Sequence, residues 1–234
     1  MNRVSLNIDL GELPDEPDEL YSLATVVNIA CGGHAGDQAS MHGALVLAQK
    51  ANARVAAHPS YPDREGFGRK TMKISAADLR NSLQLQMAQL SNLANVVGVD
   101  IVAVKPHGAL YHDLHTSPEW AEAFLSALDD VFASSVAVVG PPQGSMGKTV
   151  TSRDRRYWRE GFADRTYLSD GRLAPRSHPD ALITDPDNAA AQALRLARQN
   201  QFDTLCVHGD TPNALAVARA VRQTLANAGF LDEL

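Results

Sequence analysis

The feature that most constrains the fold is the alternation of seven short β-like runs with amphipathic helical segments along the whole chain. Most of the runs are rich in Val, Ile or Ala and apolar on both faces, which is typical of covered parallel strands. The predicted strands span residues 4–9, 26–30, 54–57, 101–105, 136–139, 157–161 and 204–207. Repeated strand–helix units favour an α/β fold, and about seven of them suggest a (β/α) barrel. A doubly wound open sheet is the alternative architecture.

Capping residues mark the starts of the longer helices. Ser75 is followed three positions later by an acidic residue, as in a capping box, and precedes a helix with one apolar face. Ser117, Asp185 and Thr211 each stand directly before a proline, the residue that suits the first helical position. Weaker patterns predict helices over residues 41–51 and 144–151.

Composition limits the class of protein. At 234 residues with 44% hydrophobic and 21% charged side chains, the chain suits one domain spanning residues 1–234. A net charge of −6 argues against a nucleic-acid partner. The sequence contains neither a signal-peptide pattern nor an apolar run that could span a bilayer, so we expect no membrane partner. With two cysteines, Cys31 and Cys206, a reducing cytoplasm is the expected compartment.

Ionisable and polar residues gather where the predicted strands end. In parallel α/β folds the loops at the carboxyl ends of the strands converge on one face and build the site. Residues far apart in the sequence are therefore expected to share one pocket. The candidate site residues are Asp9, Glu12, Asn28, His34, Asp37, His58, Lys105, His107, Asp164, Arg165, His208 and Asp210.

Six of these strand ends carry recognisable segments. Residues 7–12 read Asn-Ile-Asp-Leu-Gly-Glu, and residues 104–111 read Val-Lys-Pro-His-Gly-Ala-Leu-Tyr. Together with residues 28–37, 57–69, 162–167 and 206–212, they resemble, in order, the signatures of the LamB/YcsF (lactam utilisation) family. The chain departs from the family at Ile8, where the family has cysteine, and at Gly33, where it has phenylalanine. The second change is expected to reshape the pocket.

The resemblance implies a fold and an activity. The fold would be a (β/α) barrel like those of glycoside hydrolases and deacetylases. The activity would be the hydrolysis of 5-oxoproline to glutamate, coupled to ATP hydrolysis, as the A subunit of a 5-oxoprolinase that also has B and C subunits. ATP would bind either to this chain or to a partner subunit.

An unstrained lactam is a poor electrophile, so its opening needs an activated carbonyl, a nucleophile and a proton for the leaving nitrogen. Phosphorylation of the lactam oxygen by ATP would activate the carbonyl. Carboxylates and histidines can orient water and exchange protons, while Lys105 or Arg165 can hold a carboxylate or phosphoryl oxygen. The predicted catalytic residues are Asp9, Glu12, His34, His58, His107, His208 and Asp210. The predicted substrate-binding residues are Asn28, Asp37, Lys105, Asp164 and Arg165.

Two other functions are compatible with the same residue types. A metal-dependent deacetylase or amidohydrolase, acting on a carbohydrate or another amide, would hold a divalent metal between Asp9, His34, His58 and His107. The absence of a short His-x-x-x-His pair argues against it. A non-catalytic lactam-binding subunit is disfavoured because binding pockets are mostly apolar.

Several other signals are interpreted as structural. Residues 144–149 resemble a P-loop, but Pro142 stands where that motif requires glycine. Cys206 is expected to pack in the core. His112 and His115 are assigned to loops outside the site.

Overall fold

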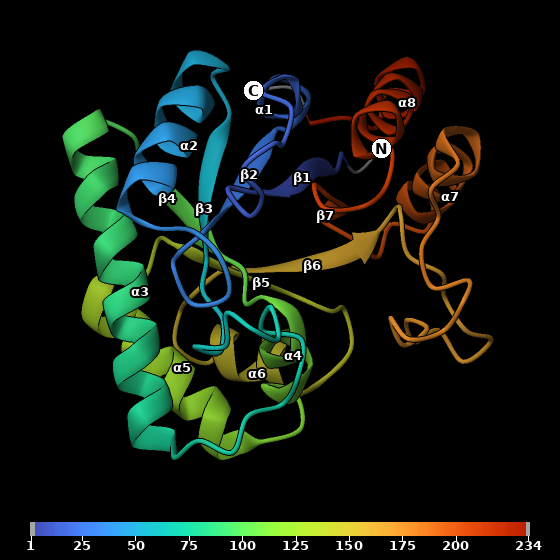
Figure 1. Cartoon of the computed structure of the whole chain (residues 1–234). Helices are drawn as coiled ribbons and strands as arrows, with labels where there is room; N and C mark the ends of the chain where they lie inside the picture. Colours follow the sequence, from blue (N-terminus) through green and yellow to red (C-terminus); the bar gives the residue numbers. More distant parts are fainter. Residues whose placement is uncertain (1–2, 233–234) are drawn as a thin grey trace.

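Seven parallel strands close into a barrel in the computed structural model, which describes residues 3–232 (Figure 1). Each strand pairs with its neighbour in the sequence, and β7 pairs back with β1, so the sheet has no free edge. The strands are β1 Ser5–Leu10, β2 Val26–Ala30, β3 Arg54–His58, β4 Ile101–Val104, β5 Ala137–Gly140, β6 Tyr157–Phe162 and β7 Thr204–His208. The predicted (β/α) barrel is confirmed, and the open sheet is excluded.

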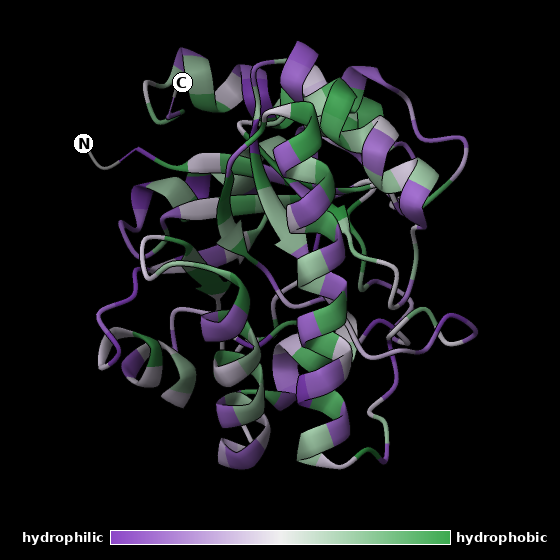
Figure 2. Ribbon diagram, turned by 90° about the vertical axis from the view of Figure 1, so that its left-hand side faces the viewer, coloured by the Kyte–Doolittle hydropathy of each residue, from purple (hydrophilic) through white to green (hydrophobic). Residues whose placement is uncertain are grey.

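Helices surround the barrel, with the long α3 on one side and α7 and α8 on the opposite side (Figure 1). Figure 2 shows hydrophobic strands inside and hydrophilic residues on the outer faces of the helices. Among residues 3–232, no helix is both long and apolar enough to cross a membrane. The helices are α1 Glu19–Leu23, α2 Gln38–Lys50, α3 Ala76–Val97, α4 Gly108–Asp113, α5 Pro118–Val131, α6 Ser145–Thr151, α7 Pro186–Arg198 and α8 Ala214–Asn227.

The buried apolar residues form one large core and two small clusters, because strand side chains alternate between the two faces of the sheet. Outward residues of β1, such as Leu6 and Ile8, join the large core between strands and helices. A separate small cluster fills one end of the barrel interior. It consists of Val26, Ala56, Ala103, Ala137 and Val139. The small side chains leave little room for a larger residue.

The predicted caps of three helices are confirmed. The side chains of Ser75, Ser117 and Asp185 each accept a hydrogen bond from a backbone N–H in the first turn of α3, α5 and α7. The predicted cap of α8 is wrong. That helix begins at Ala214, and the hydroxyl of Thr211 instead donates to Asp164 at 2.9 Å.

Overpacking the inner cluster should destabilise the barrel. We expect Ala103→Leu to lower the free energy of unfolding by about 1–3 kcal/mol, because added methylene groups force neighbouring side chains from their preferred rotamers. Urea denaturation followed by circular dichroism measures the change. Ala39→Leu, on the exposed first turn of α2, is the matched control. Equal stability of the two variants would contradict this packing.

Candidate functional site

Strand register brings distant polar residues together inside the barrel. Asp9 in β1 lies beside Asn28 in β2 and beside His208 in β7. The side-chain amide of Asn28 donates to Asp9 Oδ1 at 2.7 Å and to Asn7 Oδ1 at 2.7 Å. Polar side chains from β1 and β2 therefore meet inside the barrel.

Lys105 lies at the centre of this polar layer. Its ammonium group is 2.8 Å from Asp9 Oδ1 and 2.9 Å from Glu160 Oε1. It also donates to Asn7 Oδ1 at 3.1 Å and lies 3.1 Å from Cys206 Sγ. One buried cation thus forms ion pairs with two buried carboxylates, one from β1 and one from β6.

The charges of this cluster support one another. Burial by itself would raise the pKa of Asp9, but the charge of Lys105 and the contact with His58 outweigh it and hold that pKa well below its usual value. Burial would likewise lower the pKa of Lys105, yet Asp9, Cys206 and Glu160 raise it well above its usual value. Asp9 and Lys105 are therefore both ionised at neutral pH.

A carboxylate orients the histidine at the end of β7. Asp164 Oδ1 lies 3.0 Å from Nδ1 of His208, and Asp164 Oδ2 accepts the backbone N–H of His208 at 2.8 Å. The ring of Phe162 stacks on the imidazole with its centroid 5.6 Å away. Because Asp164 accepts the Nδ1 proton, Nε2 points toward Asp9, whose Oδ2 is 4.0 Å away. An acid–base catalyst requires this kind of orientation.

A second cluster combines Glu12 with three buried histidines. Glu12 Oε1 lies 2.9 Å from His34 Nε2, 3.2 Å from His107 Nδ1 and 3.6 Å from His58 Nε2. Burial would raise the pKa of Glu12, but its contacts with His107 and His34 hold it well below the usual value. Burial, with His34 beside it, lowers the pKa of His107 to about 3. His107 is therefore neutral at physiological pH.

Close backbone contact between two loops positions His107. Gly108 has a φ of +59°, and a Cβ there would lie 2.4 Å from the carbonyl oxygen of Gly68. Phe67, a non-glycine residue with a φ of 53°, directs its carbonyl to His107 Nε2 at 3.0 Å. A positive φ is costly for a bulky residue, so the surrounding packing must hold Phe67 in place.

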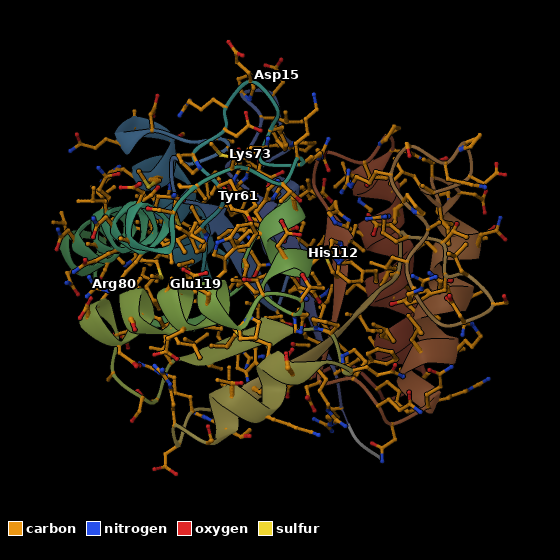
Figure 3. The ribbon with its side chains drawn as sticks, turned by 90° about the horizontal axis from the view of Figure 1, so that it is seen from below. Asp15, Tyr61, Lys73, Arg80, His112 and Glu119 are labelled. Carbon is orange, nitrogen blue, oxygen red and sulfur yellow. The ribbon has the colours of Figure 1, made fainter. Side chains whose placement is uncertain are left out.

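The polar layer opens into a cavity of about 790 Å³. Its inner wall includes Asp9, His58, Lys105, His107, Glu160 and His208. Five arginines line it as well, namely Arg69, Arg165, Arg172, Arg176 and Arg195. Figure 3 views the molecule from below and labels His112 on α4, another residue of the cavity wall. The cavity is therefore rich in cationic side chains, although the whole chain carries a net charge of −6.

The structure revises four of the predicted substrate contacts. Asp37 is exposed and caps α2 in a capping box with Ser40, so it serves the helix. Lys105 lines the cavity, but its ammonium group is already paired with Asp9 and Glu160, which leaves less of its charge for an incoming anion. Asn28 and Asp164 lie behind Asp9 and His208, which they orient.

The remaining predicted residues differ in whether their side chains reach the cavity. Asp9, His58, His107, His208 and Arg165 line the cavity. Glu12 and His34 lie behind the cavity wall, where they contact His58 and His107. Asp210 forms ion pairs with Arg69 and Arg176. The guanidinium of Arg165 donates to the backbone carbonyls of Ala174 and Ala181, so it also fixes the segment between β6 and α7.

Sequence reasoning missed Glu160 and misplaced two histidines. Glu160 is a charged residue inside a predicted strand, and this unusual position was the sequence signal that could have marked it as a site residue. Cys206 packs in the core as expected, in a small cluster with Tyr111 and Phe162. It also lies against Lys105 because it shares the inward face with Asp9. His112 and His115, assigned to loops outside the site, line the cavity, and His112 belongs to α4.

Gly33 packs against buried polar side chains. It is buried outside the cavity wall, and a Cβ at this position would lie 2.4 Å from Ser60 Oγ and 2.5 Å from Gln86 Oε1. Gln86 Oε1 accepts the backbone N–H of Ser60 at 3.0 Å. Because glycine has no Cβ, the buried side-chain amide of Gln86 can pack directly against it.

Fold and site together define a (β/α)-barrel protein with a buried carboxylate–lysine–histidine centre beneath a cationic cavity. Residues 4–231 match the model of the LamB/YcsF family, and the chain belongs to this family. It is 39% identical to the A subunit of 5-oxoprolinase from Methylococcus capsulatus, covering 97% of this chain and 94% of that protein. The protein of the same name from Nocardia farcinica is 38% identical, with 98% of each chain covered.

Solved structures agree with this assignment. The crystal structure of a lactam utilization protein from Thermus thermophilus is 36% identical, covers 97% of each chain and has a TM-score of 0.89. A family 4 carbohydrate esterase from Streptomyces lividans is 14% identical, with a TM-score of 0.58 over 100% of this chain and 92% of that one. The second similarity shows a shared fold alone.

Removing the central cation should destabilise the protein strongly. We expect Lys105→Met to lower the free energy of unfolding by about 3–5 kcal/mol, because two carboxylates would remain buried beside an apolar side chain. Lys148→Met, at an exposed position on α6, is the matched control. Chemical denaturation measures both changes. A Lys105→Met/Glu160→Gln double variant should recover part of the loss, and an unchanged stability of Lys105→Met would contradict the ion cluster.

Proposed function

We propose that this chain opens the lactam ring of 5-oxoproline to give glutamate. The reaction depends on ATP, and the chain acts in it together with B and C subunits. The observation that carries the proposal is the cavity wall formed by Asp9, His208 and Lys105. The full-length similarity to proteins named as the A subunit of 5-oxoprolinase supports the same substrate.

The residues of the site suit the proton transfers of ring opening. Water adds its oxygen to the carbonyl carbon, the C–N bond breaks, and the ring nitrogen receives a proton. Asp9 is held as a carboxylate by Lys105 and Asn28, so it can accept a hydrogen bond from the water and orient it, while Nε2 of His208 takes the proton of the water. His208, oriented by Asp164, can deliver a proton to the leaving nitrogen.

The arginines of the cavity suit an anionic substrate. 5-Oxoproline carries a carboxylate. Transfer of the γ-phosphoryl group of ATP to its lactam oxygen would release ADP, add negative charge and activate the carbonyl, and the group would leave as inorganic phosphate after water has added to the carbonyl carbon. Arg195 donates to the neutral side chain of Gln192, which leaves its charge available to such an anion. Binding measurements on each separate protein decide whether ATP binds to this chain or to one of its partners.

Reconstitution tests the proposal. The chain is combined with candidate B and C subunits, and the release of glutamate and of ADP from 5-oxoproline and ATP is followed. We expect both products from the complete mixture and ADP without glutamate when this chain is omitted. Glutamate formation in its absence would refute the assignment of ring opening to this chain.

Substitutions in the His208 pair test the proton transfer. We expect His208→Ala and Asp164→Asn each to lower the turnover number for glutamate by about 10²–10⁴-fold, because the proton carrier is removed or misoriented. His42→Ala, on the exposed surface of α2, should leave turnover unchanged. Circular dichroism verifies that the variants are folded. If both site variants bind 5-oxoproline and turn over normally, the chain only binds the lactam, while its partners perform the chemistry.

A further inference from the structure

We propose that Glu12, His58 and His107 form a binding site for a divalent transition-metal ion of the zinc class, at the inner wall of the cavity. The inference does not depend on the proposed lactam substrate, because it concerns which atoms face one another in the free chain. It also changes the ligand set expected from the sequence, since Glu12 takes the place of Asp9 and His34 has a supporting role.

The first argument is the direction of the lone pairs. His58 Nδ1 lies 2.7 Å from the backbone carbonyl oxygen of Lys105, and His107 Nε2 lies 3.0 Å from that of Phe67. A carbonyl only accepts, so each of these nitrogens carries the proton of its ring. The other two nitrogens, His58 Nε2 and His107 Nδ1, then present lone pairs, yet they lie 3.0 Å from each other.

Three acceptors therefore converge on one point. Glu12 Oε1 lies 3.2 Å from His107 Nδ1 and 3.6 Å from His58 Nε2. In their neutral forms the two rings and the carboxylate oxygen repel one another at this separation, unless a proton or a metal ion lies between them. Backbone carbonyls on the far nitrogens are the usual partners of metal-bound histidines, since they fix the tautomer and the orientation of the ring.

The separations suit a transition metal. Zinc–nitrogen and zinc–oxygen bonds of about 2.0–2.1 Å in a tetrahedral site place neighbouring ligand atoms about 3.3 Å apart. The three measured separations are 3.0, 3.2 and 3.6 Å. Imidazole ligands favour such ions over Mg²⁺ or Ca²⁺, which prefer oxygen. Since His58 and His107 also line the cavity, the remaining position of the ion would face it.

Ring geometry excludes His34 from the same coordination shell. Its imidazole lies parallel to that of His107, at an interplanar angle of 3° and a centroid distance of 3.5 Å. Two parallel stacked rings cannot both direct an in-plane lone pair at one ion. His58, by contrast, stands at 86° to His107. His34 Nε2, 2.9 Å from Glu12 Oε1, is therefore a positioning residue that orients the carboxylate.

A competing cluster is less suitable. Asp9, Cys206 and His208 also lie close enough to share an ion. The ammonium group of Lys105, however, is 2.8 Å from Asp9 Oδ1 and 3.1 Å from Cys206 Sγ. Burial and the charge of Asp9 raise the pKa of the Cys206 thiol well above its usual value. Lys105 thus supplies the positive charge there, and a second cation would be repelled.

The test is metal binding by the full-length chain, purified without a histidine tag and stripped with a chelator. We expect titration with Zn²⁺, followed by calorimetry and elemental analysis, to give one ion per chain and to raise the melting temperature. Glu12→Gln and His107→Ala should each weaken Zn²⁺ binding by more than about 100-fold, since loss of an outer partner alone costs about 10–100-fold. His42→Ala and His115→Ala, which change histidines outside the cluster, should bind as the wild type does.

The other outcomes are equally specific. Failure of the folded wild-type chain to bind Zn²⁺ or Co²⁺ would overturn the proposal. The close contact between the rings of His58 and His107 would then be explained by a proton shared between them. Undiminished affinity in folded Glu12→Gln and His107→Ala would also overturn it. If these variants do not fold, the wild-type stoichiometry and the visible spectrum of the Co²⁺ form decide. Because the measurement uses neither 5-oxoproline nor ATP, its result is independent of the reconstitution experiment.

Discussion

The buried contact of Lys105 with Asp9 and Glu160 is the constraint around which the site is built. A charge can remain inside a protein only when opposite charges and hydrogen bonds compensate its loss of water. The ammonium group meets this condition with carboxylates from β1 and β6, and with the amide oxygen of Asn7. These contacts cross the barrel interior, so the same cluster ties together strands that are not neighbours in the sheet.

The site depends further on hydrogen bonds that fix the orientation of its histidine rings. Asp164 fixes the ring of His208, and the carbonyls of Lys105 and Phe67 fix those of His58 and His107. Each imidazole therefore has one nitrogen committed to the scaffold and the other available at or near the cavity. Such preorganisation removes the cost of ordering these groups when a substrate or an ion arrives. In both the proposed ring opening and the proposed metal site, one nitrogen of each ring is fixed by the scaffold and the other is available to a ligand.

Much of the fold followed from local patterns. Most of the seven strands were located from Val-, Ile- and Ala-rich runs, and three of the helix starts from a capping side chain. The cap of α8 was misassigned because Thr211 serves Asp164, a contact with a residue 47 positions away that no local pattern reveals. The same limit explains Asp37, whose position after a predicted strand suggested a ligand contact although its carboxylate caps α2. Glu160 was overlooked because reasoning from strand ends does not consider a charge within a strand.

The sequence by itself determined the barrel and the face on which the polar residues gather, because side-chain periodicity and the polarity of parallel strands follow from backbone geometry. It also determined the family, through six ordered segments. Only the tertiary structure decided which of these residues line the cavity, which ones hold a neighbour, and which nitrogen of each histidine is free. Those properties depend on distances between side chains from different strands and loops, to within a few tenths of an ångström, and spacing along the chain does not encode them.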